Sequence, residues 1–536
     1  MLVSNIKKQL GNKEVLKNIT FTLSNNDKVG LVGINGSGKS TLLKILSGEI
    51  KQDFGSVKLN EQTVAYLKQE IPYIYNEMSI LEYIKQEIGI DKLEENLKKL
   101  ESNLTEDNME EYSDILNKFL AIDGYMFEDN LKNTLLGLNL KENIDCKIAS
   151  LSGGEKIKVL LAIVLIKNAD ILLLDEPTNN LDLKAIEWLE DKLKSSDKKM
   201  IIISHDEVFL NNIVNKIFEL SDGTISEYNL SYADYLSQKD IEYNHLKENY
   251  LKVQEQRDKL KKQVQKAKEW ANKGVNKKAH NDNDKLANNY AKEKTNSANI
   301  AKLSKELEEL KVPNFTEKKP IKVFFSFDNS KGNKDILLER LVCGYDEFTT
   351  PELNLLIPFG TRLNVTGENG SGKTTLLKTI IGQINPVKGE VKLGSGVKIG
   401  YISQNTLDSK IEDGILKYLT KENSNIDKSR VFMLLDKFNI NYHDKDKSYA
   451  ILSPGERTRV NLAKIVMDNI NVLILDEVTN HLDKEALDLI YELVREYDGT
   501  IISISHNRKY NEQLNADIDL DMQTGKILKK SLHKHR

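Results

Sequence analysis

Cysteine is nearly absent from this chain of 536 residues, which contains only Cys146 and Cys343. Two isolated cysteines provide no framework for disulfides, a zinc site or an iron–sulfur cluster, and they suit a reducing cytosol. No apolar stretch approaches the roughly 18 residues that a membrane helix needs. The start, MLVSNIKKQL, lacks the long apolar segment of a signal peptide. We therefore expect a cytoplasmic protein with no membrane partner.

A strong net charge is also missing, since the formal value is −4 at pH 7. The chain as a whole therefore has no basic character that would indicate a nucleic-acid partner. Its mass of 61.0 kDa supports two or three domains with ample core.

Five short motifs occur in the same order in both halves of the chain. The first set is Gly33–Ser40 (GINGSGKS), Gln69, Leu151–Glu155 (LSGGE), Ile171–Glu176 (ILLLDE) and His205. The second set is Gly367–Thr374 (GENGSGKT), Gln404, Leu452–Glu456 (LSPGE), Val472–Glu477 (VLILDE) and His506. One glycine loop can arise by chance, but five ordered repeats indicate two nucleotide-binding units.

The glycine-rich motif predicts a phosphate loop between a strand and a helix. Its backbone N–H groups and the helix N-terminus point at phosphate oxygens, and glycine lets the backbone come that close. The lysine then reaches the β and γ phosphates, and the hydroxyl after it can ligate Mg²⁺. The predicted ATP-binding loop residues are Gly33, Ile34, Asn35, Gly36, Ser37, Gly38, Lys39, Ser40 and Thr41, and Gly367, Glu368, Asn369, Gly370, Ser371, Gly372, Lys373, Thr374 and Thr375.

Two apolar runs end in Asp175 and Asp476 and read as buried parallel strands that place a carboxylate at the sheet's carboxyl edge. The next residues, Glu176 and Glu477, are predicted to polarise the attacking water, because phosphoryl transfer needs mostly positioning and charge neutralisation. Each histidine follows an Ile-rich strand and a serine. A lone histidine there would more often be an ordinary strand-end residue, and only the ordered set favours a role for it at the γ phosphate.

These motifs resemble the Walker A, Q-loop, signature, Walker B and switch-histidine elements of ABC ATPases, and the resemblance covers nearly the whole chain. It implies two head-to-tail ATPase domains with an ATP between the phosphate loop of one and the signature of the other. One site would combine Lys39, Ser40, Gln69, Asp175, Glu176 and His205 with Ser453, Gly455 and Glu456. The other would combine Lys373, Thr374, Gln404, Asp476, Glu477 and His506 with Ser152, Gly154 and Glu155. The implied Mg²⁺ ligands are Ser40, Gln69, Thr374 and Gln404.

Three positions depart from the family pattern without removing a phosphate-contacting group. Pro454 replaces a signature glycine, and Val478 replaces the proline after the catalytic glutamate. The aromatic residue that usually stacks on adenine corresponds to Leu10 in the first half, and Tyr345 lies near the equivalent place in the second. We expect both sites to hydrolyse ATP, with looser base recognition in the first.

The first half carries an insertion. Gln69 and Ser152 are 83 positions apart, whereas Gln404 and Ser453 are 49 apart. The extra residues fall at about 81–120, where leucines at helical spacing and many acidic residues predict a helical hairpin. Such a charge run is more often a solvated helix face than a binding surface.

A second extra segment lies between the halves. An apolar 4-3 stripe from Leu246 to Ala271, repeated from Ile300 to Leu310, predicts an antiparallel coiled-coil hairpin. Arg257 to Lys278 holds nine basic and two acidic residues. A solvated coiled coil is the ordinary interpretation, but positive charge gathered near the tip of an acidic protein favours a polyanion such as RNA. The candidate contacts at the tip are Trp270, Lys273, Val275, Lys277, Lys278 and His280.

The predicted fold is α/β, with two tandem P-loop ABC-type ATPase domains joined by an α-helical coiled-coil hairpin linker. The predicted domains are 1–225, with the arm insertion; 226–318, with its basic tip at about 270–285; and 319–536, with a short basic tail. This arrangement resembles the ABC-F proteins, with the Walker B regions DEPTNNLD and DEVTNHLD close to that family's DEPTNHLD. A short arm, a moderately long linker and no C-terminal coiled coil resemble the antibiotic-resistance branch.

That resemblance implies an ATPase that acts as a monomer and binds the bacterial ribosome in its exit-tRNA site, near large-subunit rRNA and the peptidyl-site tRNA. It implies protection against drugs of the pleuromutilin, lincosamide and streptogramin A type, and no DNA partner. A general ABC-F translation factor shares the same motifs and remains an alternative. A fused importer ATPase subunit fits less well, because its linker is usually short and its signatures usually end in Gln. A DNA-repair ATPase would carry its coiled coil inside one ATPase domain.

Overall fold

The computed structural model describes residues 1–140, 143–275, 301–310, 332–345, 348–403, 412–420, 428–438, 440, 442–479, 482 and 484–530. The chain divides into two compact units. The first unit contains Met1–Tyr232 and Ile321–Arg536, and the second contains Ala233–Pro320. The predicted boundary between residues 318 and 319 lies outside the described residues.

The first half of the chain is built on one sheet, which has nine strands among the described residues, in the order β4-β1-β2-β9-β8-β3-β7-β6-β5. Its strands are β1 (Leu2–Leu10), β2 (Lys13–Thr22), β3 (Lys28–Val32), β4 (Phe54–Lys58), β5 (Val64–Tyr66), β6 (Ile171–Asp175), β7 (Lys199–Ile203), β8 (Lys216–Ser221) and β9 (Thr224–Tyr228). The central strands β5, β6, β7, β3 and β8 pair in parallel. Every residue of β6 and β7 is buried, as expected for strands covered on both faces.

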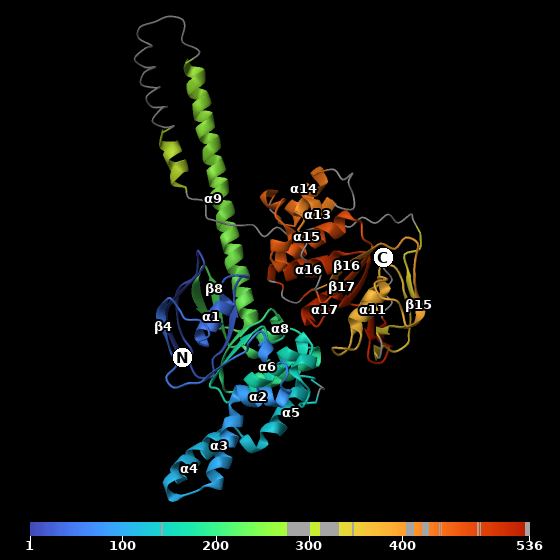
Figure 1. The fold of residues 1–536 in the computed structure, drawn as a ribbon. Helices are drawn as coiled ribbons and strands as arrows, with labels where there is room; N and C mark the ends of the chain where they lie inside the picture. The colour runs from blue at the N-terminus through green and yellow to red at the C-terminus, as the bar shows by residue number, and fades with distance from the viewer. Residues whose placement is uncertain are drawn as a thin grey trace, which may run out of the picture. The chain divides into compact units, whose positions relative to one another are not determined.

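The helices of the first half follow its strands and insertion. They are α1 (Lys39–Leu46), α2 (Ile80–Ile88), α3 (Ile90–Ser102), α4 (Met109–Ala121), α5 (Phe127–Gly137), α6 (Gly153–Ile166), α7 (Leu183–Lys194) and α8 (Glu207–Ile213). Helices α3 and α4 pack on each other and lie within the segment where the sequence predicts an inserted hairpin (Figure 1). Of α3, only Ile90 and Leu97 are buried, so most of this helix faces solvent.

The second half repeats this plan with a six-stranded sheet in the order β16-β17-β18-β14-β19-β20, as far as the described residues extend. The strands of the second half are β10 (Ile336–Val342), β11 (Gly344–Tyr345), β12 (Phe348–Thr349), β13 (Leu353–Ile357), β14 (Arg362–Thr366), β15 (Lys388–Leu393), β16 (Ile399–Ser403), β17 (Val472–Asp476), β18 (Thr500–Ile504), β19 (Ile518–Asp521) and β20 (Lys526–Lys530). Strands β13, β10 and β15 form a separate three-stranded sheet, and β11 pairs with β12. Strands β16, β17, β18, β14 and β19 pair in parallel.

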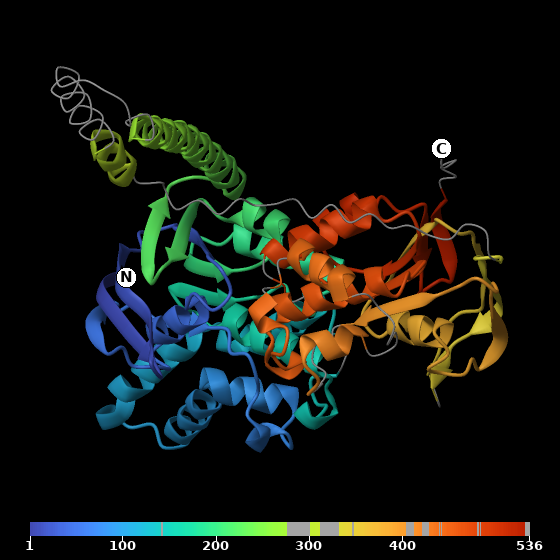
Figure 2. The same ribbon diagram turned by 90° about the horizontal axis from the view of Figure 1, so that it is seen from above.

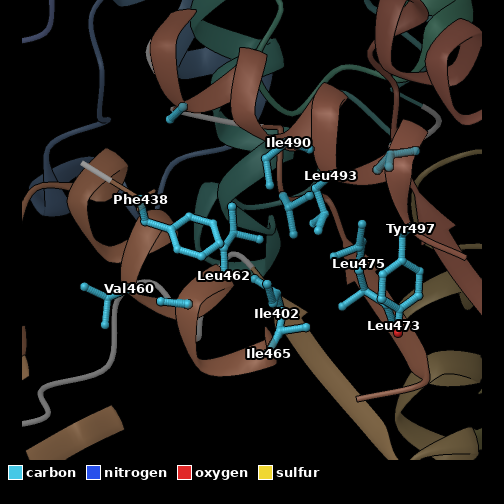
Figure 3. Packing of buried hydrophobic residues seen from close by; sticks show 14 of the residues in the cluster. Ile402, Phe438, Val460, Leu462, Ile465, Leu473, Leu475, Ile490, Leu493 and Tyr497 are labelled. Atoms are coloured by element: carbon cyan, nitrogen blue, oxygen red, sulfur yellow. The ribbon is translucent and has the colours of Figure 1, made fainter. Parts of the chain in front are cut away.

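The helices of the second half are α11 (Lys373–Ile380), α13 (Ile415–Thr420), α14 (Lys428–Lys437), α15 (Pro454–Met467), α16 (Lys484–Glu496) and α17 (Arg508–Leu514). Side chains of α15 and α16 meet those of β17 in a core that also contains Phe438 and Tyr497, both 1% exposed (Figure 3). Truncating such a residue to alanine typically costs about 3–5 kcal/mol. This core fixes β17, which ends at Asp476.

The second unit contains all but the first residue of a long helix, α9 (Tyr232–Val275), together with a helical stretch at residues 301–309. Both views show α9 as one continuous helix (Figures 1 and 2). Its 44 residues correspond to about 66 Å at about 1.5 Å per residue. The two predicted arms of the hairpin are therefore helical where the structure describes them. The fold prediction, two tandem α/β P-loop ATPase domains, is confirmed.

Candidate nucleotide sites

Each half carries a phosphate loop between a parallel strand and a helix. The first joins β3 to α1, and the second joins β14 to α11. The residues before the two helices, Gly38 and Gly372, are left-handed with φ of 103° and 90°. A Cβ on Gly38 would lie 2.5 Å from Val15, and one on Gly372 would lie 2.6 Å from Thr350. Glycine is therefore required at both places, both for the backbone conformation and for space.

The lysine that begins each helix turns back over its loop. The Nζ of Lys39 donates to Gly33 O at 2.7 Å and Ile34 O at 3.2 Å. Lys373 repeats this geometry in the second half, at 2.8 and 3.0 Å from the corresponding carbonyl oxygens. Burial lowers the pKa of Lys373, although the carboxylates of Glu477 and Asp476 act in the opposite direction. Both lysines are thus held at the mouth of a loop that presents N–H donors to an anion.

The aspartates at the ends of β6 and β17 are buried beside the hydroxyl residue that follows each lysine. Thr374 Oγ1 donates to Asp476 Oδ1 at 3.2 Å, and the hydroxyl of Ser40 hydrogen-bonds to Asp175. Gln69 Nε2 lies 3.5 Å from Asp175 Oδ2. Burial is the main cause that raises the pKa of both carboxyl groups. These oxygen donors fit Mg²⁺, which prefers carboxylate, hydroxyl and phosphate oxygens. Gln404 lies outside the described residues.

The glutamates after these aspartates have a strained backbone. Glu176 and Glu477 both have a φ of 51°, in the left-handed region that non-glycine residues rarely adopt. Each backbone N–H donates to the neighbouring strand, Glu176 to Ile203 O at 2.9 Å and Glu477 to Ile504 O at 3.0 Å. These hydrogen bonds hold the strained turn in place. Strain of this kind gathers at functional sites, and here it occurs at the same position in both halves.

The two histidines lie next to these glutamates. His205 Nε2 is 3.4 Å from Glu176 Oε1, and His506 Nε2 is 4.0 Å from Glu477 Oε1. Burial and the charge of Lys373 lower the pKa of His506 to about 4, so this imidazole is neutral at pH 7. Its Nε2 has no hydrogen-bond partner among the described residues. A neutral imidazole in this place can offer an N–H group to a phosphate oxygen.

Two tyrosines that the sequence motifs do not include also lie beside the aspartates. Tyr401 donates its hydroxyl to Asp476 Oδ2 at 3.0 Å. Tyr66 occupies the equivalent place in the first half, three residues before Gln69, but its buried hydroxyl makes no hydrogen bond within the described part of the chain. Their common position three residues before the Q-loop glutamine is the sequence signal for these residues.

The signature serines cap the helices that follow them. Ser152 accepts a hydrogen bond from Glu155 N at 3.3 Å, while its hydroxyl donates to Glu155 Oε2 at 2.6 Å. Ser453 and Glu456 form the same capping box at the start of α15. Pro454 occupies the first turn of α15, where a missing N–H is tolerated. The departure from glycine at Pro454 therefore leaves the helix start intact.

A cavity of about 370 Å³ lies over the first phosphate loop. Its lining includes the loop and the predicted site residues Gln69, Asp175, Glu176 and His205, together with Leu10 and Val15. Among the described residues that line it, none comes from the second-half signature. The first-half part of this site is thus assembled, whereas Ser453 and Glu456 are not among the described residues that line the cavity.

The second site has an aromatic residue that sequence reasoning missed. Tyr345 pairs with Phe348 across the short β11–β12 hairpin. A Cβ on Gly372 would lie 3.1 Å from the ring of Phe348, which places this ring directly beside the phosphate loop. Phe348 is an aromatic residue only three positions after Tyr345 in the sequence, but the motif spacing pointed to Tyr345. Tyr345 itself is 49% exposed.

Residues of both halves meet in a crevice beside the two glutamates. Its lining includes Glu176, His205, Asn369, Glu477 and His506. Asn369 Nδ2 donates to Asn180 O at 3.0 Å, so the second phosphate loop touches the turn after the first Walker B strand. The catalytic candidates of both halves are therefore brought to one crevice.

The ribosome-contact candidates are described only in part. The backbones of Trp270, Lys273 and Val275 belong to α9, whereas Lys277, Lys278 and His280 lie outside the described residues. Upstream of them, α9 exposes Arg257, Lys259, Lys261, Lys262, Lys266 and Lys268. Of the predicted basic tail, residues 531–536 also lie outside the described residues. No described helix combines the length and the apolar character needed to span a bilayer.

Comparison with known proteins agrees with this geometry. A family model described as "ABC transporter" matches residues 16–179 and 351–480, more than half of the chain, and a second model of the same description matches residues 218–320. Paired phosphate loops, Walker B strands and signature helices in one chain thus define a tandem ABC ATPase, which binds and hydrolyses ATP.

Similar proteins indicate which family of tandem ABC ATPases this chain belongs to. "Probable ATP-binding protein YbiT" of Escherichia coli O157:H7 is 31% identical over 524 residues, which cover 96% of this chain and 94% of that protein. "ABC transporter F family member 5" of Arabidopsis thaliana is 31% identical over 534 residues, covering 96% of this chain and 73% of that protein. The chain belongs to the ABC-F family.

Solved structures share the fold at low sequence identity. The protein titled "RNase-L Inhibitor" has a TM-score of 0.58 and 18% identity, covering 97% of this chain and 87% of its own. An archaeal structure titled as a complex of "ribosomal stalk protein aP1" and "ribosome recycling factor aABCE1" has a TM-score of 0.53 and 18% identity, covering 96% of this chain and 87% of that chain. At this identity the likeness concerns the fold alone.

Proposed function

We propose that this ABC-F ATPase binds the bacterial ribosome in the exit-tRNA site and protects the peptidyl-transferase centre from antibiotics, using ATP binding and hydrolysis. The observation that carries the ribosomal part is α9, a 44-residue helix with a basic stretch. From Arg257 to Lys268 it has six exposed cations and one carboxylate, Asp258. Such a stretch favours a polyanionic partner, because lysine and arginine release the counterions that surround RNA phosphates.

In the proposed reaction, each phosphate loop and its lysine bind the β and γ phosphates through N–H donors. Mg²⁺, at Ser40 with Asp175 and at Thr374 with Asp476, would neutralise phosphate charge. Glu176 and Glu477 accept the proton of the attacking water, and the adjacent histidines orient toward the γ phosphate. Little covalent chemistry is needed, since positioning and electrostatic stabilisation supply most of the catalysis.

Signature residues complete each site in this proposal. Closure of the halves brings Ser453 and Gly455 to the ATP held by Lys39, and Ser152 and Gly154 to the ATP held by Lys373. Binding of ATP favours the closed state and holds the protein on the ribosome, and hydrolysis releases it. The linker, with Trp270, Lys273, Val275, Lys277, Lys278 and His280, then reaches toward large-subunit rRNA and the peptidyl-site tRNA.

Cosedimentation with ribosomes tests the partner. The Glu176→Gln, Glu477→Gln chain should pellet with ribosomes in ATP and remain in the supernatant with ADP. The reason is that it binds ATP but does not hydrolyse it, so the ATP-bound state persists. A Lys261→Ala, Lys262→Ala version should show a shallower salt dependence of binding. The matched control is Lys388→Ala with Lys392→Ala, two lysines of β15 that are also exposed. Equal salt slopes for both pairs would remove the role assigned to α9.

Drug protection is tested by minimum inhibitory concentrations with and without the gene. We expect higher values for pleuromutilins, lincosamides and streptogramin A, and unchanged values for small-subunit aminoglycosides. A chain that binds ribosomes but raises none of these three values would be a general ABC-F translation factor instead.

A further inference from the structure

Helices α8 and α17 occupy equivalent places in the two halves, and they pack against each other. Helix α8 follows His205 and α17 follows His506, positions that differ by 301, as do Asp175 and Asp476. The contact therefore joins equivalent surfaces, as a two-fold interface between identical subunits would. Here, however, the two surfaces have different sequences.

Ion pairs cross this contact from one half to the other. The Arg508 guanidinium donates through both terminal nitrogens to the Glu190 carboxylate on α7. Lys509 Nζ donates to Glu207 Oε2 at 2.7 Å, and Lys484 Nζ lies 3.6 Å from Glu207 Oε1. Two-point pairing of arginine with a carboxylate fixes orientation as well as adding attraction.

The charges around Arg508 are largely removed from water, whereas the side chains of Lys509 and Lys484 are 34% and 48% exposed. The side chain of Glu190 is 9% exposed, that of Asp206 is 10% exposed, and Arg508 lies 3.9 Å from Asp206. Ion pairs on an open surface contribute little, but removing one partner of a buried pair leaves the other charge unpaired, which is strongly unfavourable. The pairing of the halves thus depends on both sides carrying their own sign of charge.

Around α8 and α17 the sign of charge differs between the halves, although one ion pair between the halves, Lys184 Nζ with Glu368 Oε1 at 3.3 Å, has its cation on the first half. At five equivalent positions the first half has Leu183, Glu190, Asp206, Glu207 and Val208, and the second half has Lys484, Tyr491, Asn507, Arg508 and Lys509. The first set contains three carboxylates and no cation, and the second contains three cations and no carboxylate.

The helix dipole does not explain this division. Glu207 begins α8, where a negative charge is favourable, but Arg508 and Lys509 begin α17, where positive charge is unfavourable. The cations therefore oppose the stability of their own helix. Their placement is explained by the carboxylates that they meet on the first half.

We propose that this pairing contact, formed by Glu190, Asp206 and Glu207 with Lys484, Arg508 and Lys509, selects the second half of the same chain as the partner of the first. Two first halves meeting at this surface would oppose carboxylates, and two second halves would oppose cations. Repulsion of the wrong pairings adds to attraction in the right one. The partner that fits the surface is thus the chain's own other half, and not a second copy.

Charge reversal and its repair test this inference in the full chain. One variant is Arg508→Glu with Lys509→Glu, the second is Glu190→Lys with Glu207→Lys, and the third carries all four changes. Each two-residue variant should show amide hydrogen exchange in α8 and α17 faster by at least about tenfold, because the contact opens more often. In the four-residue variant, the exchange rates in α8 and α17 should return to within about threefold of those in the original chain. The ATPase rate should fall and recover in parallel, a readout that rests on the proposed composite sites.

Lys388→Glu with Lys392→Glu is the matched control, because it reverses two cations that form ion pairs with Glu352 and Glu339 inside the second half. It should leave exchange in α8 and α17 unchanged. Unchanged exchange in the two-residue variants, or a four-residue variant no better than they are, overturns the inference. If a two-residue variant does not fold, the four-residue variant is the test: recovery of folding supports the pairing contact, and failure to fold overturns it. A different outcome is hydrogen exchange that follows the expected pattern while the ATPase rate does not change with it. That result would overturn the proposal that each ATP site is shared by both halves, but it would support the pairing contact.

Discussion

The two nucleotide sites share their backbone geometry but differ in the side chains around the aspartate. Both have a left-handed glycine before the helix, a lysine folded over the loop and a glutamate at φ 51°. In the second site the aspartate accepts a hydrogen bond from Tyr401, whereas the hydroxyl of Tyr66 has no such partner among the described residues. Backbone geometry is thus the part common to both sites, and side-chain partners provide the means to give them different rates.

The largest expected effect separates the turnover of the two sites. Glu176→Gln should remove hydrolysis at the first site and Glu477→Gln at the second, because an amide keeps the shape but does not accept a proton. The chain with both changes should lose about 10² to 10⁴ in rate while it still binds ATP. Measuring phosphate release for each single variant gives the rate of the remaining site. Full activity in the double variant would contradict the role of both glutamates.

The next effect concerns pH and the second site. The pKa of His506 is lowered to about 4 in the folded chain, below its ordinary value of 6.5. The unfolded chain therefore binds more protons between these values, so the stabilisation is complete above pH 6.5 and is lost as the pH falls toward 4. The full difference corresponds to about 3 kcal/mol. Urea unfolding at pH 6.5 and 4.5 should show a smaller loss for His506→Gln than for the original chain, and His245→Gln, at an exposed position, should behave like the original.

Base recognition should differ between the sites by a smaller amount. Phe348→Ala should weaken ATP binding at the second site by about 1–2 kcal/mol if its ring stacks on adenine, since base stacking has this order of magnitude. Leu10→Phe should strengthen ATP binding at the first site. Titration with a fluorescent ATP analogue, in chains with one phosphate loop disabled, measures each site. A larger loss from Tyr345→Ala than from Phe348→Ala would return the stacking role to Tyr345.

The smallest expected effect compares the two tyrosines. Tyr401→Phe removes a hydrogen bond to Asp476 and should change the rate at the second site by roughly fivefold, equivalent to about 1 kcal/mol. Tyr66→Phe should change the first site less, because its hydroxyl has no partner to lose within the described residues. Each variant is assayed with the opposite glutamate replaced by glutamine. Equal effects from both changes would show that the asymmetry around the aspartates has no consequence for turnover.

The fold and the paired phosphate loops could be predicted because their signals are local. A glycine-rich loop before a helix and an apolar run before Asp175 or Asp476 carry their own backbone requirements. The pairing contact could not be predicted, because Glu190 and Arg508 are 318 positions apart and each looks like an ordinary surface charge in the sequence. Phe348 was missed for a related reason: the pairing of β11 with β12, and not its spacing from the glycines, brings the ring to Gly372.

The capping boxes at the two signatures mean that each helix start already holds an anion of its own. The carboxylate of Glu155 accepts from the backbone N–H of Ser152 at 2.8 Å and from its hydroxyl, and Glu456 accepts from Ser453 N at 2.8 Å. A phosphate oxygen that engages the same serine must compete with this carboxylate. In each signature, the position that a phosphate oxygen would take beside the serine is thus already taken by the glutamate carboxylate of the same helix. If the proposed closure brings ATP to these serines, Glu155→Gln with Glu456→Gln should close at lower nucleotide concentrations than the original chain.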